Sequence, residues 1–338
     1  MVRVFIAGLI AMVVSVVIGP KFIEFLRRNE LGQPIREDGP AGHVVKQGTP
    51  VMGGLLILLC AVIPFLALSK FTLPALTVLF LTVSCAAVGF LDDFIKVRHR
   101  RSLGLQGRWK LILLAAITVV VGLAVHAQSQ LDTSIYIPVL NIDVPLSYAY
   151  YPFLFLVIAG AANGANLTDG LDGLAAGVGI IALLTFLSIN VIGYIRSGDV
   201  GSRTAFLLDL AILAAALIGA AIGFLWYNAF PAELFMGDTG SMAFGGALAG
   251  FAIMTKTEAL LLLIGGVFVI EALSVIIQVI AFKLTGRRVF LMAPLHHHFE
   301  MKAWSETKIM VRFWVVCAIF CASGFALFYR DFLQFVHP

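Results

Sequence analysis

Two adjacent aspartates, Asp92 and Asp93, end an apolar segment in "GFLDDFIKVRHRR". Carboxylates side by side at a helix C-terminus repel each other and the negative end of the helix dipole, so a nearby cation would stabilise them. A plain solvated helix end is the alternative interpretation. The basic residues that follow, from Lys96 to Lys110, add positive charge to the same place. We therefore interpret the pair as a candidate for metal binding or catalysis.

A second polar segment, "NGANLTDGLDGLAAG", spaces Asn163, Asn166, Asp169 and Asp172 by three residues. This spacing brings neighbours close together on a helix or a tight helical turn. The glycines between them allow the backbone to approach a ligand, and the oxygen-rich side chains suit Mg²⁺ or nucleoside hydroxyls. A polar turn between two helices is the simpler interpretation, but it does not require the two asparagines.

The third acidic motif is "FMGDTGSMAFGG", in which Asp238 stands just before a new apolar helix. Thr239 or Ser241 would cap that helix locally. A helix N-terminus also attracts anions, and Mg²⁺ commonly binds through one or two carboxylates together with substrate phosphates. The motif therefore favours a metal-bridged phosphate.

Three consecutive histidines, His296, His297 and His298, occur in "RRVFLMAPLHHHFE". Consecutive side chains on a helix point in different directions and no cysteine lies nearby, which argues against a zinc site. Recognition of a phosphate or a peptide carboxylate is more economical. Lys46, in "HVVKQGTPVMGG", either extends to the membrane surface or contacts substrate. Glu271 lies within an apolar run, where buried acids often mark transport paths.

Composition predicts that these motifs belong to a membrane protein. The 338 residues are 60% hydrophobic and 12% charged, against roughly a quarter charged in soluble domains. A membrane-spanning helix needs about 20 apolar residues, and runs of that length recur throughout the chain. The four cysteines lie in apolar runs and predict no disulfide framework. We expect an all-α protein, one integral membrane domain over residues 1–338, with no nucleic-acid partner.

Ten spans can be drawn, at about residues 2–26, 51–69, 71–91, 109–127, 148–167, 174–195, 204–227, 240–256, 259–282 and 308–329. The odd-numbered loops and their flanks hold 17 of the 23 lysines and arginines. The positive-inside rule then places those loops in the cytoplasm and both termini outside. The acidic motifs fall on the cytoplasmic side. A homodimer is the expected assembly, because closed dimers are the commonest oligomers.

Five motifs in order resemble the polyprenyl-phosphate N-acetyl-hexosamine-1-phosphate transferase superfamily: "KQGTPVMGG", "FLDDFIKV", "NLTDGLDGLA", "FMGDTGS" and "PLHHHFE". The resemblance spans nearly the whole chain. The first and last motifs are most similar to the branch that transfers phospho-N-acetylmuramoyl-pentapeptide. A neighbouring branch, which transfers N-acetylglucosamine 1-phosphate, shares the aspartate motifs and stays open as an alternative.

The resemblance implies that undecaprenyl phosphate attacks the β-phosphate of UDP-N-acetylmuramoyl-pentapeptide, releases UMP and requires Mg²⁺. It implies a multi-pass protein of the bacterial cytoplasmic membrane whose active site faces the cytoplasm. Asp238 would bind Mg²⁺, Asp92 would act as the base, and Asp93 would support the metal or diphosphate. A covalent route through an aspartyl nucleophile stays open. Binding roles fall to Lys46, Lys96, Lys110, Asn166, Asp169, Asp172, Asn228, Phe235, His296, His297 and His298.

Within this set, Asn166, Asp169 and Asp172 would line the nucleotide and diphosphate, and Asn228 and Phe235 would lie near the uracil. The histidines would shape the sugar-peptide side. A secondary transporter that uses Glu271 is the remaining alternative. Transporters concentrate polar groups near the middle of the bilayer, whereas most acids here stand at helix ends, so position disfavours that interpretation.

Overall fold

The computed structural model describes residues 1–29, 31–32, 48–99, 101, 103–128, 131–199 and 202–336. Its elements are α1 (Val2–Arg28), α2 (Gly53–Leu68), α3 (Leu73–Arg98), α4 (Gly107–His126), β1 (Ser134–Ile137), β2 (Ile142–Pro145), the short 3₁₀ helix η2 (Ser147–Ala149), α5 (Tyr150–Thr168), α6 (Leu174–Arg196), α7 (Ala205–Asn228), α8 (Gly237–Met254), α9 (Glu258–Ile264), α10 (Gly266–Thr285), α11 (Leu295–Glu300) and α12 (Glu306–Val336). The chain is mostly helical, as predicted.

Seven of the described helices are long and apolar enough to cross a membrane: α1, α3, α4, α6, α7, α10 and α12. Their outward faces are apolar, with Phe5 75% and Leu123 66% exposed. Exposed aliphatic and aromatic side chains on this scale are typical of a lipid-facing surface. The chain is therefore an integral membrane protein.

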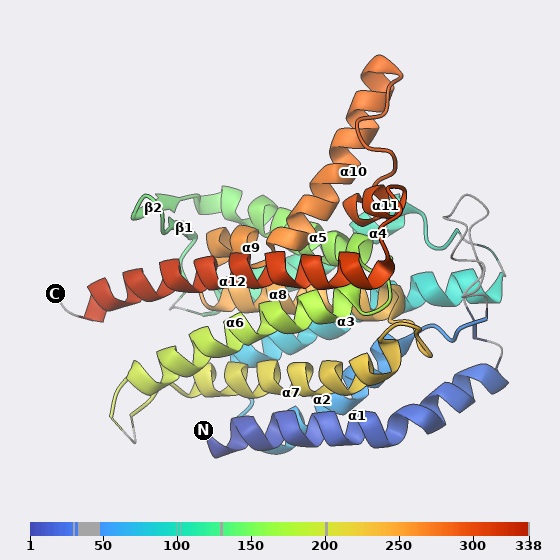
Figure 1. Cartoon of the computed structure of the whole chain (residues 1–338). Coiled ribbons are helices and arrows are strands. Elements are labelled where there is room, and N and C mark those ends of the chain that lie inside the picture. The colour runs from blue at the N-terminus through green and yellow to red at the C-terminus, as the bar shows by residue number, and fades with distance from the viewer. Residues whose placement is uncertain are drawn as a thin grey trace.

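Two details differ from the expected pattern. The loop between α4 and α5 forms an antiparallel hairpin of β1 and β2, whereas an all-α protein was expected. The ninth predicted span, 259–282, is broken into α9 and α10 at the pair Gly265 and Gly266. Glycine pairs are common sites of sharp helix kinks. After this break α10 leaves the bundle at a steep angle (Figure 1).

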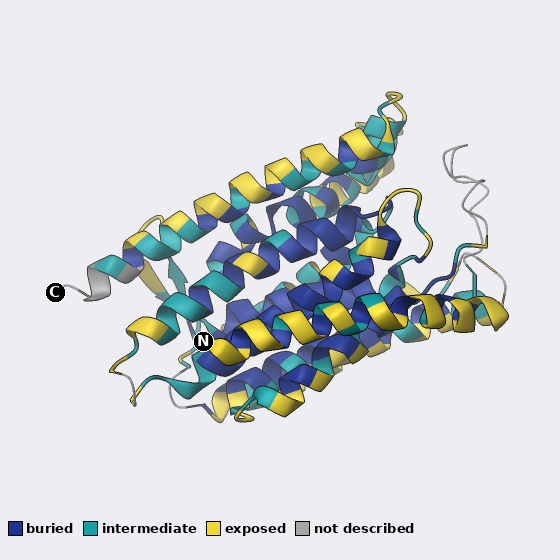
Figure 2. Cartoon of the chain, turned by 60° about the horizontal axis from the view of Figure 1, so that its bottom comes forward, coloured by how far each residue is buried: buried dark blue, intermediate teal, exposed yellow. Residues whose placement is uncertain are grey.

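The centre of the bundle is formed by α7 and α8. Helix α8 packs against α3 and α5, and α7 packs against α1, α2 and α6. Close approach depends on small residues, because a Cβ on Gly245 would lie 2.2 Å from the Ala161 carbonyl oxygen of α5. Glycine and alanine serve the same purpose between membrane helices generally. Buried residues fill the central helices and exposed ones follow the outer faces (Figure 2).

The helix ends that carry the acidic motifs gather at one end of the bundle. Helices α3, α5 and α7 end there, and α4, α6 and α8 begin there (Figure 1). The chain termini and the β1–β2 hairpin lie at the opposite end. Alternating helix direction therefore brings motifs that are far apart in the sequence to the same surface.

Candidate active site

Three carboxylates meet where α3 ends and α8 begins. Oxygen atoms of Asp92, Asp93 and Asp238 all lie within 4.8 Å of one another. The approach requires a glycine on α3, because a Cβ on Gly89 would lie 2.1 Å from the Asp238 carbonyl oxygen. Two motifs that the sequence presents separately are thus one site.

Asp93 caps helix α8 from another helix. Its carboxylate accepts the backbone N–H of Asp238 at 3.1 Å, and the N–H and hydroxyl of Thr239 at 2.9 and 2.7 Å. The local caps expected from the sequence do not form, since Thr239 donates to Asp93 and Ser241 donates to the Gly237 carbonyl. A carboxylate has two oxygens and can accept all three of these groups at once, whereas a capping hydroxyl offers one oxygen. Asp93 therefore fixes the backbone that carries Asp238.

Two lysines hold the remaining carboxylates together. The Lys96 ammonium lies 2.5 Å from Asp92 and 2.9 Å from Asp238. The Lys110 ammonium, at the start of α4, lies 3.0 Å from Asp92 and 2.7 Å from Asp238. Burial disfavours ionisation of Asp238, but Lys96 and Lys110 outweigh it and hold the pKa of this carboxyl well below its usual range. Asp238 is accordingly ionised at neutral pH.

A short loop covers Asp92. The backbone N–H of Leu105 donates to one of its carboxylate oxygens at 2.7 Å, and a Cβ on Gly104 would lie 2.5 Å from both oxygens. The side chain is buried. Asp92 is thus held by two ammonium groups and one backbone amide.

The turn between α5 and α6 lies beside this cluster and carries the second motif. Asn166 donates to the Ser241 hydroxyl on α8 at 3.1 Å, and Asp172 accepts the Ala232 backbone N–H at 3.0 Å. Burial, and then the negative charges of Asp238 and Asp93, raise the pKa of Asp169 well above its usual range. The turn therefore stands within electrostatic reach of the acidic cluster.

Asn228 is the last residue of α7, and Phe235 lies in the loop between α7 and α8. The Asn228 side chain is buried, accepts the Gly173 backbone N–H at 3.0 Å and donates to the Leu234 carbonyl at 2.9 Å. The backbone of Phe235 bonds to Pro50 and Gly53, each at 2.8 Å, and its side chain is half-buried. The hydrogen bonds of Phe235 therefore connect the described part of the first motif, "GTPVMGG", to the third motif, "FMGDTGS". Lys46 lies outside the described residues.

The three histidines have three different partners. His296 contacts the Glu271 carboxylate through Nδ1 at 3.2 Å, and His297 contacts the Glu300 carboxylate. His298 accepts the Leu291 backbone N–H through Nδ1 at 3.1 Å. The rings therefore serve separate local contacts, and only His296 is fully buried.

Sequence reasoning missed three participants in the site. Thr239 and Ser241 were considered only as local caps. Glu271 was considered as a sign of transport, as a hydrogen-bond partner of a neighbouring helix or as part of a groove for the lipid. The hydroxyls in "GDTGS" are the one local signal that pointed to this region. Their partners, Asp93 and Asn166, are more than 70 residues away, so no spacing rule relates them.

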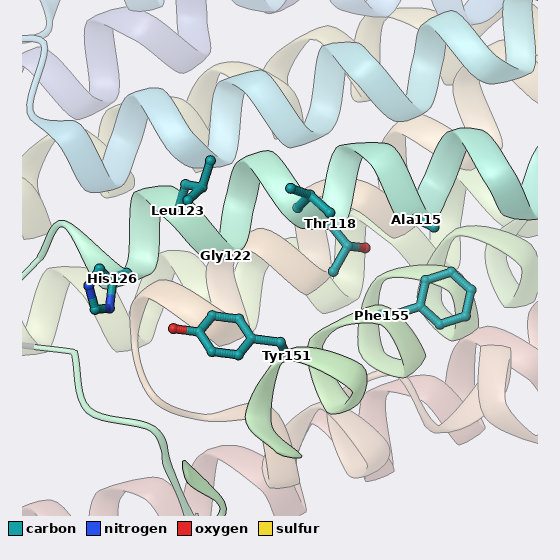
Figure 3. Close-up of a pocket in the computed structure, with 8 residues that line it drawn as sticks. Ala115, Thr118, Gly122, Leu123, His126, Tyr151 and Phe155 are labelled. Atoms are coloured by element: carbon teal, nitrogen blue, oxygen red, sulfur yellow. The ribbon is translucent and has the colours of Figure 1, made fainter. Parts of the chain in front are cut away.

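A cavity of about 500 Å³ lies between α4 and α5. It is lined mostly by apolar side chains, with His126 at the end of α4 and Tyr151 at the start of α5 lying on the same side of it (Figure 3). The lining residues are Ala115, Thr118, Val119, Gly122, Leu123, His126, Tyr151 and Phe155. Ala115 stands five residues after Lys110 on α4, so the cavity follows the same helix away from the acidic cluster.

The fold and site together define a membrane-embedded helical protein with a carboxylate and lysine centre at one end of the bundle. The sequence model of glycosyl transferase family 4 matches residues 75–256, which carry all three aspartate motifs. The chain belongs to this family, and within it to the phospho-N-acetylmuramoyl-pentapeptide-transferases.

Its relatives of that name are similar over nearly their full length. The protein of Rubrobacter xylanophilus is 45% identical over 97% of this chain and 98% of its own. That of Halalkalibacterium halodurans is 46% identical over 92% of this chain and 93% of its own. The protein of Geobacillus kaustophilus is 47% identical over 94% of this chain and 96% of its own.

Proposed function

We propose that this chain transfers phospho-N-acetylmuramoyl-pentapeptide from UDP-N-acetylmuramoyl-pentapeptide to undecaprenyl phosphate, giving lipid I and UMP in peptidoglycan synthesis. A phosphate oxygen of the lipid bonds to the β-phosphorus of the donor, and the bond from that phosphorus to the oxygen of the α-phosphate breaks. UMP leaves with that oxygen. The observation that carries the proposal is Asp238 held between Lys96 and Lys110, beside Asp92, in a chain with these relatives.

The site supports charge neutralisation as the main catalytic task. Two phosphate-bearing substrates repel each other, and negative charge spreads over the transferring group in the transition state. Lys96 and Lys110 supply positive charge at the place where the carboxylates gather. Pre-positioned charges of this kind need no reorganisation during the reaction.

Magnesium fits the carboxylate cluster. The three aspartates offer oxygen atoms within 4.8 Å of one another, and Mg²⁺ takes one or two carboxylates plus substrate phosphates. Asp238 would hold the ion, because its backbone is fixed by Asp93 and its side chain is the most exposed of the three. When bound, the ion would neutralise charge on the donor diphosphate.

Direct attack by the lipid phosphate is the route we propose, with Asp92 as the base that assists it. Both oxygens of Asp93 accept N–H groups of α8, and one also accepts the Thr239 hydroxyl. These contacts fix Asp93 as a helix cap and disfavour it as a covalent nucleophile. They support the direct route over an intermediate on Asp93.

We propose that the remaining motifs recognise the UDP-linked donor. The turn that carries Asp169 and Asp172 would line the nucleotide and diphosphate, with Asn166 attached to α8 through Ser241. Asn228 and Phe235 would lie near the uracil, at the loop between α7 and α8. Lys46 would lie close to a phosphate. The histidines would face the sugar and peptide.

The α4–α5 cavity offers an apolar surface that suits the hydrocarbon chain of the lipid substrate. Its mostly apolar lining begins five residues beyond Lys110, which stands in the carboxylate cluster. One lipid molecule would therefore place its phosphate at the carboxylate cluster and its hydrocarbon chain along α4. We propose that undecaprenyl phosphate lies along this path, within the surrounding membrane lipids.

All ten predicted ranges contain helix, and we propose that ten segments cross the bacterial cytoplasmic membrane. The end of α3, the start of α8 and helix α11 carry the acidic cluster and the histidines, and they lie at the opposite end of the bundle from both termini (Figure 1). The excess of basic residues in the loops at the acidic end supports a cytoplasmic active site and external termini. A homodimer is the proposed assembly.

A donor comparison tests the proposal. Purified protein in detergent would be incubated with undecaprenyl phosphate, Mg²⁺ and one UDP-sugar at a time, and UMP and the lipid product would be measured. We expect turnover with UDP-N-acetylmuramoyl-pentapeptide only. Product formed only from UDP-N-acetylglucosamine would move the chain to the neighbouring branch.

A further inference from the structure

Glu271 is an acidic residue with no exposed surface that the proposed mechanism does not use. It stands near the start of α10, just after the break at Gly265. One carboxylate oxygen accepts the Leu295 backbone N–H at 2.6 Å. The other accepts the His296 backbone N–H at 3.2 Å and faces Nδ1 of the His296 ring, also at 3.2 Å. The carboxylate therefore joins α10 to the beginning of α11.

This arrangement decides which ring nitrogen of His296 carries hydrogen. Both Glu271 oxygens already accept backbone N–H groups, so the carboxyl group serves as an acceptor and a ring nitrogen that bonds to it must donate. Nδ1 of His296 is thus the N–H of the ring, and the neutral imidazole has its lone pair on Nε2. The assignment follows from the Glu271 oxygen that faces Nδ1.

Nε2 of His296 points at the donor-binding turn. A Cβ on Gly170 would lie only 2.2 Å from Nε2, so the ring rests directly against the turn between Asp169 and Asp172. Among the described residues this nitrogen is buried and has no hydrogen-bond partner. A buried polar atom without a partner is destabilising, and a ligand that donates to it would remove that cost.

We propose that Glu271 is a positioning residue that holds His296 in the Nδ1–H tautomer, so that Nε2 accepts a hydrogen bond from the donor substrate. The substrate group would be a hydroxyl or amide N–H of the sugar-peptide part, because an acceptor nitrogen requires a donor. This inference rests on the proposed function, since it places that part of the donor beside the α5–α6 turn. Glu271 does not touch substrate itself.

Nitrogen NMR of the histidine rings provides the first test. Protein labelled with ¹⁵N-histidine would be studied without substrate, and the His296 signals would be identified by their loss in His296→Gln. We expect hydrogen on Nδ1 in the wild-type protein. Hydrogen on Nε2 would overturn the inference, whatever the activity, and this result needs no variant of Glu271 to fold.

Glu271→Gln provides the second test. Its amide keeps one oxygen for the backbone N–H groups but can turn its NH₂ towards Nδ1, which moves the ring hydrogen to Nε2. We expect that change in the spectrum and a fall in kcat of about 10- to 100-fold, as for carboxylates that orient ligating histidines. UDP affinity should change less than kcat. Either an unchanged tautomer or wild-type kcat in this variant would refute the positioning role.

Ser274→Ala is the matched control. Ser274 is buried on the same helix and donates to the backbone carbonyl of Glu271 at 2.7 Å, but it does not touch the carboxylate. We expect the wild-type tautomer and kcat. A loss equal to that of Glu271→Gln would show that any disturbance of α10 suffices, which would refute the specific role of the carboxylate. Wild-type protein that shows the Nδ1–H tautomer but makes no lipid I would contradict the proposed function alone.

Discussion

Asp93 on α3 and Thr239 on α8 form a hydrogen-bonded pair that links two helices of the active site. The Asp93 carboxylate accepts both the N–H and the hydroxyl of Thr239, at 2.9 and 2.7 Å, with both side chains buried. Asp238 is the residue before Thr239, so this pair sets the position of the candidate metal ligand. Catalysis should therefore depend on a residue that carries no charge.

Thr239→Val tests this dependence. The substitution keeps the shape but removes the hydroxyl donor to a buried carboxylate, which should lower the free energy of unfolding by about 1–3 kcal/mol. We expect kcat to fall as well, because the start of α8 is less firmly held. Thermal unfolding and UMP release would be measured together. Thr239→Ser retains the hydroxyl and should behave nearly as wild type, whereas equal losses in both variants would contradict a role for the hydrogen bond.

Asp238→Asn should abolish turnover. The change removes the proposed magnesium ligand and one of the two carboxylates that Lys96 and Lys110 share. UMP release would be followed over a Mg²⁺ titration, and high Mg²⁺ should not restore it. Asp199→Asn, in the exposed α6–α7 loop, is a matched change of charge and should leave activity intact. Substantial activity of Asp238→Asn would remove this residue from the metal site.

Asp92→Asn should lose catalysis while retaining much of the nucleotide binding. Asp92 is proposed to act on the lipid phosphate, and the groups proposed to bind the nucleotide lie on the α5–α6 turn and the α7–α8 loop. UDP binding by calorimetry and UMP release would separate the two effects. Normal turnover would exclude Asp92 as the base, and a complete loss of UDP binding would instead place it in the donor site.

Filling the α4–α5 cavity should weaken binding of the lipid substrate. Ala115 lines the cavity, so Ala115→Phe would occupy part of the path proposed for the hydrocarbon chain. We expect a higher KM for undecaprenyl phosphate and an unchanged KM for the UDP-linked donor. Ala116→Phe is the control, because Ala116 is the next residue on α4, is exposed and does not line the cavity. The same rise in both variants would exclude the cavity as the lipid path.

The helices were predictable because the signal for each is local. Each apolar run is long enough to require helical structure in a membrane, and the boundaries at Arg28, Thr168 and Asn228 fall within a few residues of those expected. The break at Gly265 was not predicted. Paired glycines permit a kink without requiring one, and the packing of Gly266 against Phe320 of α12 is a contact between distant segments.

The candidate site was partly predictable because some of its residues also give a local signal in the sequence. Asp92 and Asp93 were recognisable because two adjacent carboxylates at a helix C-terminus oppose each other and the helix dipole. Asp238 was recognisable because it stands at the start of an apolar helix, where anions are attracted. Asn228 was assigned to the uracil, and its contacts with Gly173 and Leu234 could not have been read from the sequence. The bond to Gly173 joins atoms whose distance depends on how α6 and α7 pack, and the bond to Leu234 depends on the fold of the α7–α8 loop.

The sequence by itself determined that this is a helical membrane protein with acidic motifs at the ends of its helices, because hydropathy and residue type act over a few turns. Only the tertiary structure decided which atoms those acids bind. Asp93 caps a helix that begins 144 residues later, and Glu271 orients a histidine 25 residues away. Such pairings follow from the packing of glycine-rich helix faces, and no local pattern of residues specifies them.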